Sequence, residues 1–348
     1  MPEGVRKLKD WENHSRKQTG LTRRAFLWTL FAGTVGGASG TWLLRVLKSR
    51  KMTAESFIAS LSNYQADIAG TVRSGFRELG ISPGEIKGKR VLLKPNLVET
   101  NAGASHINTH PLVIRGAIEA FMAYGATEVL VGEGPGHCRD SLLVLEEAGL
   151  VEVLAEDRIR FEDFNYDEVY SVINAGGHSP LKKLVFPETL QKVDWIVSMA
   201  KMKTHHWAGV TLSMKNLFGV MPGSYYGWPK NVLHWAGISE TILDIYATLR
   251  PHLTIVDGIV GMEGDGPVMG TPNPAGVLVM GRNFPAVDST CARIMGINPC
   301  KVPHLAAADG MLGTIREISI QKRGETIASV RTDFELVDEI PAHKGIRL

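Results

Sequence analysis

Residues 90–96 read Arg-Val-Leu-Leu-Lys-Pro-Asn, a short apolar run that ends in a Pro-Asn pair. An apolar run closed by a turn signal predicts a buried β-strand over residues 90–94. A helix is expected next, because Pro111 suits a first helical turn and Gly125 suits a helix end. Residues 127–132 then predict a second strand. This part of the chain is therefore expected to fold as strand, helix and strand.

The same alternation continues toward the C-terminus. Further strands are predicted at residues 168–173, 183–186, 194–199, 253–257 and 276–281, and further helices at about residues 239–250 and 285–295. This alternation predicts an α/β fold, with a mostly parallel, Rossmann-like sheet flanked by helices and additional short strands. The predicted organisation is a signal or anchor at 1–44, a tether at 45–60, the α/β domain at 61–313, and C-terminal edge strands with a polar tail at 314–348.

The composition excludes several classes of protein. The 348 residues are 44% hydrophobic and 21% charged, which is ordinary for a globular protein and excludes disorder, collagen or coiled coil for the whole chain. Residues 1–51 hold eleven basic and three acidic residues, so the remainder has a net charge of −6. A mildly acidic body argues against nucleic acid as a partner. Three cysteines are too few for a disulfide scaffold, and no intrinsic iron–sulfur cluster is expected.

The N-terminal segment looks like an export signal. Arg23 and Arg24 precede Ala-Phe-Leu, and residues 25–44 contain no charge. This arrangement resembles the twin-arginine signal, which predicts recognition by the twin-arginine translocase and a periplasmic or other extracytoplasmic location. Twenty uncharged residues are also just long enough to span a bilayer, and basic residues follow at 45–51. The alternatives are therefore a plain membrane anchor, or an exported protein that stays attached to the inner membrane; cleavage of the signal is left open.

Several blocks of the chain together resemble a known family. They are Val-Leu-Leu-Lys-Pro-Asn at 91–96, Lys-Met-Lys-Thr-His at 201–205, Thr-Leu-Ser-Met-Lys-Asn-Leu-Phe-Gly at 211–219, the glycine-rich block at 257–267, and Val-Asp at 287–288. Their order resembles the family called domain of unknown function 362. The resemblance implies an α/β fold and a site more than a reaction. Some members carry a ferredoxin-like segment with clustered cysteines, and this chain has no such cluster.

Basic and amide side chains gather at the predicted strand ends. In open parallel sheets, ligands bind beyond the carboxyl ends of the strands, so these residues predict a site for a small anion. Alternation along an extended segment would point Lys201, Lys203 and His205 the same way. The predicted catalytic candidates here are Lys203, His205 and Lys215, and the predicted substrate-binding residues are Lys94, Asn96, Lys201, Asn216 and His234. The alternative is an ordinary solvated charged surface.

Acidic residues form a second group of candidates. Asp257 ends a predicted strand, and Glu263 and Asp265 project from the glycine-rich segment after it, which is expected to be a tight loop. Carboxylates from one loop are typical ligands of a divalent metal, and Asp288 would add a fourth. Glu263 is also a candidate for acid–base catalysis. The alternatives are turn formation and, for Asp288, helix capping.

Two further segments give weaker signals of a binding site. The Gly-Glu-Gly-Pro-Gly loop at 132–136 could hold a phosphate, but a simple turn is favoured, and His137-Cys138 beside it carries little signal. Aromatic residues concentrate between residues 207 and 235, where they could line a pocket with Lys230 and His234 as polar points, or pack in the core.

Three functions are consistent with these features. The first is an exported enzyme that acts on a small anionic substrate at a lysine, histidine and carboxylate cleft, with a divalent metal or with proton transfer by the carboxylates. The second is a redox protein associated with a cofactor loaded in the cytoplasm or with an iron–sulfur partner. The third is a non-catalytic protein that binds a ligand or a metal.

Overall fold

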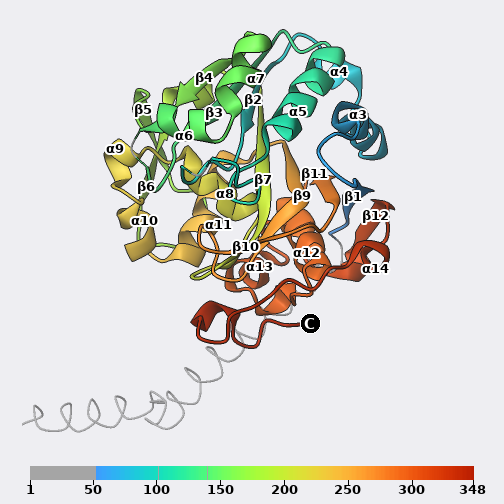
Figure 1. Cartoon of the computed structure of the whole chain (residues 1–348). Helices are drawn as coiled ribbons and strands as arrows, with labels where there is room; N and C mark the ends of the chain where they lie inside the picture. The colour runs from blue at the N-terminus through green and yellow to red at the C-terminus, as the bar shows by residue number, and fades with distance from the viewer. Residues whose placement is uncertain (1–51, 101, 139) are drawn as a thin grey trace, which may run out of the picture. The chain divides into compact units, whose positions relative to one another are not determined.

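The computed structural model describes residues 52–100, 102–138 and 140–348. Helices pack on both sides of a central sheet (Figure 1), so the predicted α/β fold class is confirmed. The strands are β1 Ala54–Ser60, β2 Arg90–Lys94, β3 Glu128–Glu133, β4 Arg160–Asp163, β5 Val169–Ile173, β6 Lys183–Pro187, β7 Trp195–His205, β8 Gly209–Thr211, β9 Leu253–Glu263, β10 Thr271–Asn273, β11 Val277–Gly281 and β12 Ile320–Gly324. The helices are α3 Ile68–Glu78, α4 Pro83–Ile86, α5 Pro111–Ala123, α6 Ser141–Glu147, α7 Leu150–Glu156, α8 Ser213–Asn216, α9 Gly223–Tyr226, α10 Asn231–Trp235, α11 Ile238–Leu249, α12 Phe284–Ile294, α13 Pro303–Ala308 and α14 Ile327–Val330.

The main sheet has the strand order β12-β1-β11-β9-β7-β2-β3-β4. The run from β9 to β4 is parallel throughout, whereas β11 is antiparallel to both β9 and β1. The short strands β8 and β10 extend the sheet at its carboxyl side, where they pair with β7 and β9. The parallel run therefore brings the carboxyl ends of β7, β2 and β3 side by side.

The core lies on both faces of the sheet, because successive strand residues point to opposite sides. In β2, Val91 and Leu93 belong to the hydrophobic cluster that includes residues of α3, α5 and α7, while Leu92 belongs to the cluster on the other face, which includes residues of α8, α11, α12 and α13. All three side chains are fully buried. Strands that bury both faces read as continuous apolar runs, which is why residues 90–94 were recognisable in the sequence.

Two predicted boundaries need correction. The predicted tether at 45–60 is wrong for its last part, since residues 54–60 form β1, which pairs with β11 and β12 inside the sheet. The glycine-rich segment after Asp257 is not a loop at first, because β9 continues to Glu263. Gly261 lies in this strand without room for a side chain, since a Cβ would meet the Met202 carbonyl and the Phe334 ring. The glycine here serves close packing rather than a turn.

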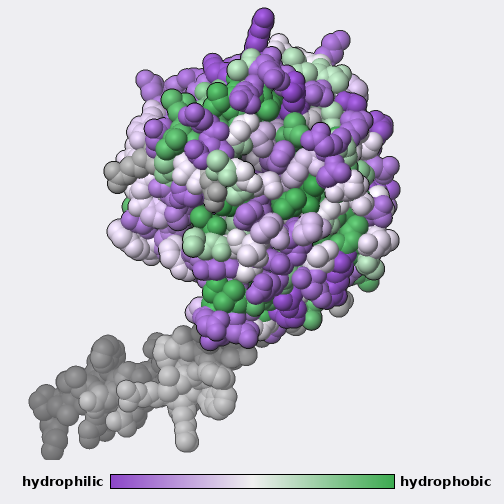
Figure 2. All heavy atoms as spheres, in the orientation of Figure 1, coloured by the Kyte–Doolittle hydropathy of each residue, from purple (hydrophilic) through white to green (hydrophobic). Residues whose placement is uncertain are grey.

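Within the predicted C-terminal segment at 314–348, β12 forms the sheet edge beside β1. On the face shown in Figure 2, hydrophilic residues predominate and hydrophobic ones form small separate groups. No helix among the described residues is both long and apolar enough to cross a bilayer. The predicted signal or anchor at 1–44 lies outside the described residues.

Candidate functional site

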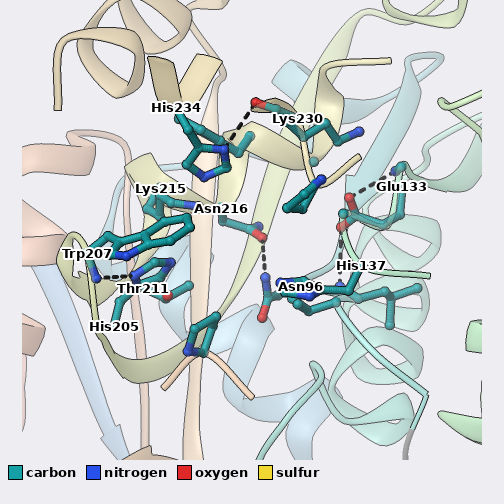
Figure 3. Close-up of a pocket in the computed structure, with 18 of the residues that line it drawn as sticks. Asn96, Glu133, His137, His205, Trp207, Thr211, Lys215, Asn216, Lys230 and His234 are labelled. Carbon is teal, nitrogen blue, oxygen red and sulfur yellow. Dashed lines mark hydrogen bonds between the residues drawn. The ribbon is translucent and has the colours of Figure 1, made fainter. Parts of the chain in front are cut away.

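A pocket of about 210 Å³ opens at the carboxyl ends of β2, β3 and β7. Figure 3 shows side chains from these strand ends and from α8 and α10 converging on it. Its lining residues are Lys94, Asn96, Leu97, Val98, Glu133, Gly134, Gly136, His137, His205, His206, Trp207, Thr211, Lys215, Asn216, Phe218, Gly219, Pro229, Lys230, His234 and Pro267. This lining contains three lysines and four histidines but a single carboxylate.

The carboxylate belongs to Glu133, and it pairs with Lys94. The Lys94 ammonium lies 2.6 Å from Glu133 Oε2, and it also donates to the Asn216 carbonyl and to Asn216 Oδ1 at 2.6 and 2.9 Å. Both charged side chains are buried, at 0% and 1% exposure. Burial lowers the pKa of Lys94 and raises that of Glu133, while their mutual attraction opposes both shifts. Because Lys94 and Glu133 neutralise one another, the pair contributes little net charge to ligand binding.

Gly219 packs directly against this ion pair. A Cβ at Gly219 would overlap the Glu133 carboxylate and the Lys94 ammonium. Its carbonyl also accepts a hydrogen bond of 2.9 Å from the amide of Gly134. Only glycine at position 219 leaves room for the Lys94–Glu133 ion pair. The sequence block at 211–219 therefore ends in a residue that is required for steric reasons.

Two histidines in the pocket have opposite tautomers. The Nδ1 atom of His205 accepts from the amides of Trp207 and Ala208 at 3.0 and 3.3 Å, so its proton is on Nε2. The Nδ1 atom of His234 lies 3.1 Å from the Lys230 carbonyl, which can only accept, so its proton is on Nδ1 and its Nε2 is unprotonated. One ring therefore offers a donor and the other an acceptor.

Burial keeps both rings neutral. The pKa of His205 is well below its usual value because of burial and of nearby Lys215, and the pKa of His234 falls to about 4 for the same two reasons. The positive charge of Lys215 contributes to both shifts, and all three side chains belong to the pocket wall shown in Figure 3. One pocket thus contains a neutral base, a neutral donor and a lysine.

The other two lysines differ in their contacts. Lys230 donates to Asn165 Oδ1 at 2.8 Å and to the Met221 carbonyl. Lys215 has no oxygen partner among the described residues, and its Nζ lies 4.1 Å from the centre of the Phe218 ring. Burial, with neighbouring Lys94 acting on both, lowers the pKa of each to about 7, and Glu133 opposes the shift. Excess positive charge in the pocket therefore resides on Lys215 and Lys230.

Two buried oxygen atoms in the pocket wall have no hydrogen-bond partner in the part of the chain that the structure describes. They are Asn96 Oδ1 and Thr211 Oγ1. The amide nitrogen of Asn96 donates to Asn216 Oδ1 at 3.2 Å, which fixes the orientation of its side chain. Buried polar atoms are usually paired, so a ligand with matching groups would satisfy both.

The structure brings six of the predicted residues into this pocket: Lys94, Asn96, His205, Lys215, Asn216 and His234. Lys201 and Lys203 do not line it. Lys201 is buried in an ion pair with Asp257 at 2.8 Å, and Lys203 donates to the carbonyls of Ile107 and Pro267 at 2.9 and 3.1 Å. The prediction that both would face the ligand needs correction, because β7 continues to His205 and both lysines lie inside the sheet.

The predicted acidic wall is absent from the pocket. Glu263 Oε2 accepts from Asn273 Nδ2 and the Glu335 amide at 2.6 and 2.9 Å, away from the pocket lining. Asp265 lies 3.4 Å from His206, and only the histidine lines the pocket. Within residues 52–100, 102–138 and 140–348, no three histidine, cysteine, aspartate or glutamate side chains are grouped as a metal site would require.

Asp288, which was expected as a fourth metal ligand, has a structural role in helix capping. Its two oxygens accept from the amides of Ser213 and Met214 at 2.8 and 2.9 Å, so it caps the start of α8 from a neighbouring helix. Burial raises its pKa to about 7 even though these hydrogen bonds oppose the shift. Asp288 thereby holds the short helix that carries Lys215.

Sequence reasoning gave too little weight to Glu133, His137 and Lys230. The loop at 132–136 resembles a simple turn in sequence, but Glu133 ends β3 and lies at the same edge of the sheet as Lys94. Lys230 belongs to the aromatic-rich segment at 207–235, of which Trp207, Lys230 and His234 line the pocket. Trp235 is 81% exposed and lies outside the lining.

The chain is similar in sequence to one known protein and in structure to two solved proteins, all at low sequence identity. It is 27% identical over 286 residues to a thylakoid-associated protein from Synechocystis sp., a match that covers 79% of this chain and 81% of that protein. Among solved structures, a Thermotoga maritima protein is 12% identical with a TM-score of 0.37, over 64% of this chain and 57% of that one. The lactate racemase apoprotein of Thermoanaerobacterium thermosaccharolyticum is 14% identical with a TM-score of 0.44, over 70% of this chain and 58% of that one.

The chain thus spans less than two thirds of either solved structure. The family profile described as domain of unknown function DUF362 matches residues 91–293, which include the pocket strands and every lysine and histidine of the lining. The chain belongs to the DUF362 family.

Proposed function

We propose that this chain is an exported enzyme that binds a small anionic substrate in the pocket and transfers protons on it. The observation that carries the proposal is the pair His205 and His234, held in opposite tautomers in the pocket that Lys215 also lines, and Lys215 has no oxygen partner among the described residues. A binding site needs only the cation. A neutral base and a neutral donor in the wall of one pocket are groups that suit proton transfer.

The charge of the pocket favours an anion. Glu133 is already paired with Lys94, so Lys215 and Lys230 supply positive charge that no carboxylate of the lining balances. A volume of about 210 Å³ suits a compact molecule, such as a short carboxylic acid, rather than a nucleotide. A carboxylate or phosphate would also accept the free donors that Lys215 and His205 present.

The two imidazoles would have different tasks. His234 Nε2 carries a lone pair and would remove a proton from the substrate as a general base. His205 is neutral, so it would not lose its Nε2 proton; it would donate a hydrogen bond to an oxygen on which negative charge develops. A carbon acid next to a carboxylate or carbonyl group needs both functions at once.

Isotope exchange tests this assignment. We expect the full-length protein in deuterated buffer to exchange a C–H proton in at least one member of a panel of short carboxylic and oxo acids, followed by proton NMR. His234→Phe should slow this exchange by about a hundredfold or more, since general base catalysis contributes that much. His178→Phe is the control, because His178 does not line the pocket.

Unchanged exchange in His234→Phe would contradict the role of this base. Absence of exchange across the panel, although the acids bind, would leave a binding protein and refute the enzyme proposal.

Export is the second part of the proposal and rests on the sequence alone. The paired Arg23 and Arg24 before an uncharged stretch predict transport by the twin-arginine route. Replacing both with lysine keeps the charge but is expected to leave the protein in the cytoplasm, as cell fractionation would reveal. Normal export of this double variant would refute the twin-arginine assignment.

A further inference from the structure

Lys215 differs from the other lysines of the pocket in a way that bears on reactivity. Lys94 is held by a carboxylate and two oxygens of Asn216, and Lys230 by two oxygens. A lysine nitrogen engaged by several oxygen acceptors is held in place, so it is less free to attack a ligand. The Lys215 nitrogen has only a ring face beside it among the described residues.

The surroundings of Lys215 favour its neutral amine. Burial and the positive charge of Lys94 bring its pKa to about 7, against the opposing effect of Glu133. Near pH 7 roughly half of such a side chain is unprotonated, compared with less than about a thousandth for an ordinary lysine. A desolvated lysine close to a second cation is a recognised form of activated amine nucleophile.

We propose that Lys215 Nζ forms an imine with the carbonyl carbon of a small anionic aldehyde or 2-oxo acid bound in the pocket. This inference rests on the proposed function, since the same anion site must hold the acid group. It specifies that function further by naming the nucleophile and the carbonyl-bearing class of substrate.

The pocket contains the groups that this step requires. The amine lone pair attacks the carbonyl carbon, and the oxygen that gains the electron pair is stabilised by the Nε2 proton of His205. His234 Nε2 can carry the surplus proton from nitrogen to this oxygen, which gives a neutral carbinolamine. The C–O bond then breaks as the nitrogen forms C=N, and the oxygen leaves as water after taking a second proton from solvent. Overall, an ammonium and a carbonyl give a protonated imine and one water.

The unpartnered oxygens in the wall are consistent with a substrate of this kind. Thr211 can donate to the carboxylate of an oxo acid and Asn96 Oδ1 can accept from the hydroxyl of a carbinolamine. Lys230 stays beside the site as a cation for the acid group. The pocket could therefore bind the acid and react with the carbonyl of one small molecule.

Reductive trapping tests the inference on the full-length protein. Glyoxylate, the smallest oxo acid, is added with sodium cyanoborohydride, which transfers hydride to the C=N carbon and leaves a stable carboxymethyl group on the lysine. We expect peptide mapping to find at least about tenfold more product on Lys215 than on any exposed lysine, because its amine fraction is far larger. Oxalate, which has no reducible carbonyl, should compete with this labelling.

Lys215→Arg is the matched variant, because arginine keeps the positive charge but forms no such imine. It should lose the dominant labelled site yet still bind oxalate, as measured by calorimetry. Lys182→Arg, at an exposed lysine outside the pocket, should label like the wild type.

The two proposals fail in different ways. If oxalate binds and Lys215 is labelled no more than exposed lysines, the imine inference is overturned and the anion site stands. If oxalate does not bind the wild type, the proposed function fails, whatever the labelling shows.

Discussion

Glu133→Leu is expected to destabilise the fold by about 3–5 kcal/mol, because it leaves the buried ammonium of Lys94 without its carboxylate. The ammonium lies 2.6 Å from the Glu133 carboxylate, and neither side chain is more than 1% exposed. The shift should appear in urea unfolding followed by circular dichroism.

The chain offers a matched control for this experiment. Lys192 and Glu188 are also 2.6 Å apart, but their side chains are 51% and 37% exposed. Removing Glu188 should cost no more than about 1 kcal/mol, because solvent screens exposed pairs. The comparison therefore isolates the effect of burial at equal distance.

A double variant separates the charge from the packing. Lys94→Met together with Glu133→Leu removes both charges and is expected to be more stable than either single variant, since no buried charge remains unpaired. A loss in Glu133→Leu as small as that in the exposed control would contradict the description of Lys94 and Glu133 as a buried, mutually dependent pair.

Lys215→Met is expected to weaken the binding of small anions by at least about thirtyfold. A charge-assisted hydrogen bond in a buried site contributes about 2 kcal/mol or more, and every 1.4 kcal/mol is a factor of ten in affinity. Lys215 is the cation of the lining whose nitrogen is free of oxygen partners among the described residues, so it has most to offer a ligand.

The affinity of the pocket for small anions is also expected to depend on pH. The pKa values of Lys215 and Lys230 both fall to about 7, and an anion prefers their protonated forms. Raising the pH through 7 removes these cations, so oxalate should bind about tenfold or more tightly at pH 6 than at pH 8.5. Glu133 and the histidines also face the ligand, but burial keeps His205 and His234 neutral across this interval.

The fold was largely predictable because the central strands, such as β2, β7 and β11, are buried on both faces. The run at 90–94 coincides with β2, and the predicted helix between Pro111 and Gly125 corresponds to α5. The errors arose where local signals disagreed with packing. The glycines of β9 are typical of a loop in sequence but serve close contacts in the strand. The segment that forms β1 carries no local signal of pairing, because its partners, β11 and β12, lie far away in the sequence.

The pocket residues at the carboxyl ends of the strands were predictable from the sequence, whereas the contacts of the charged residues inside the sheet were not. The rule that ligands bind at strand carboxyl ends identified Lys94, Asn96 and His205. It did not show which charges neutralise one another, since the pairing of Lys201 with Asp257 depends on long-range register. Tautomers were beyond the sequence for the same reason, because they are fixed by backbone groups around each ring.

Calorimetric titration of the full-length protein with oxalate at pH 6 measures whether the pocket is an anion site that depends on Lys215. We expect saturable binding of one oxalate per chain in the wild type and in Lys182→Met, and an affinity at least about thirtyfold lower in Lys215→Met. Equal oxalate affinity in the wild type and in Lys215→Met would contradict the assignment of this pocket as the anion site.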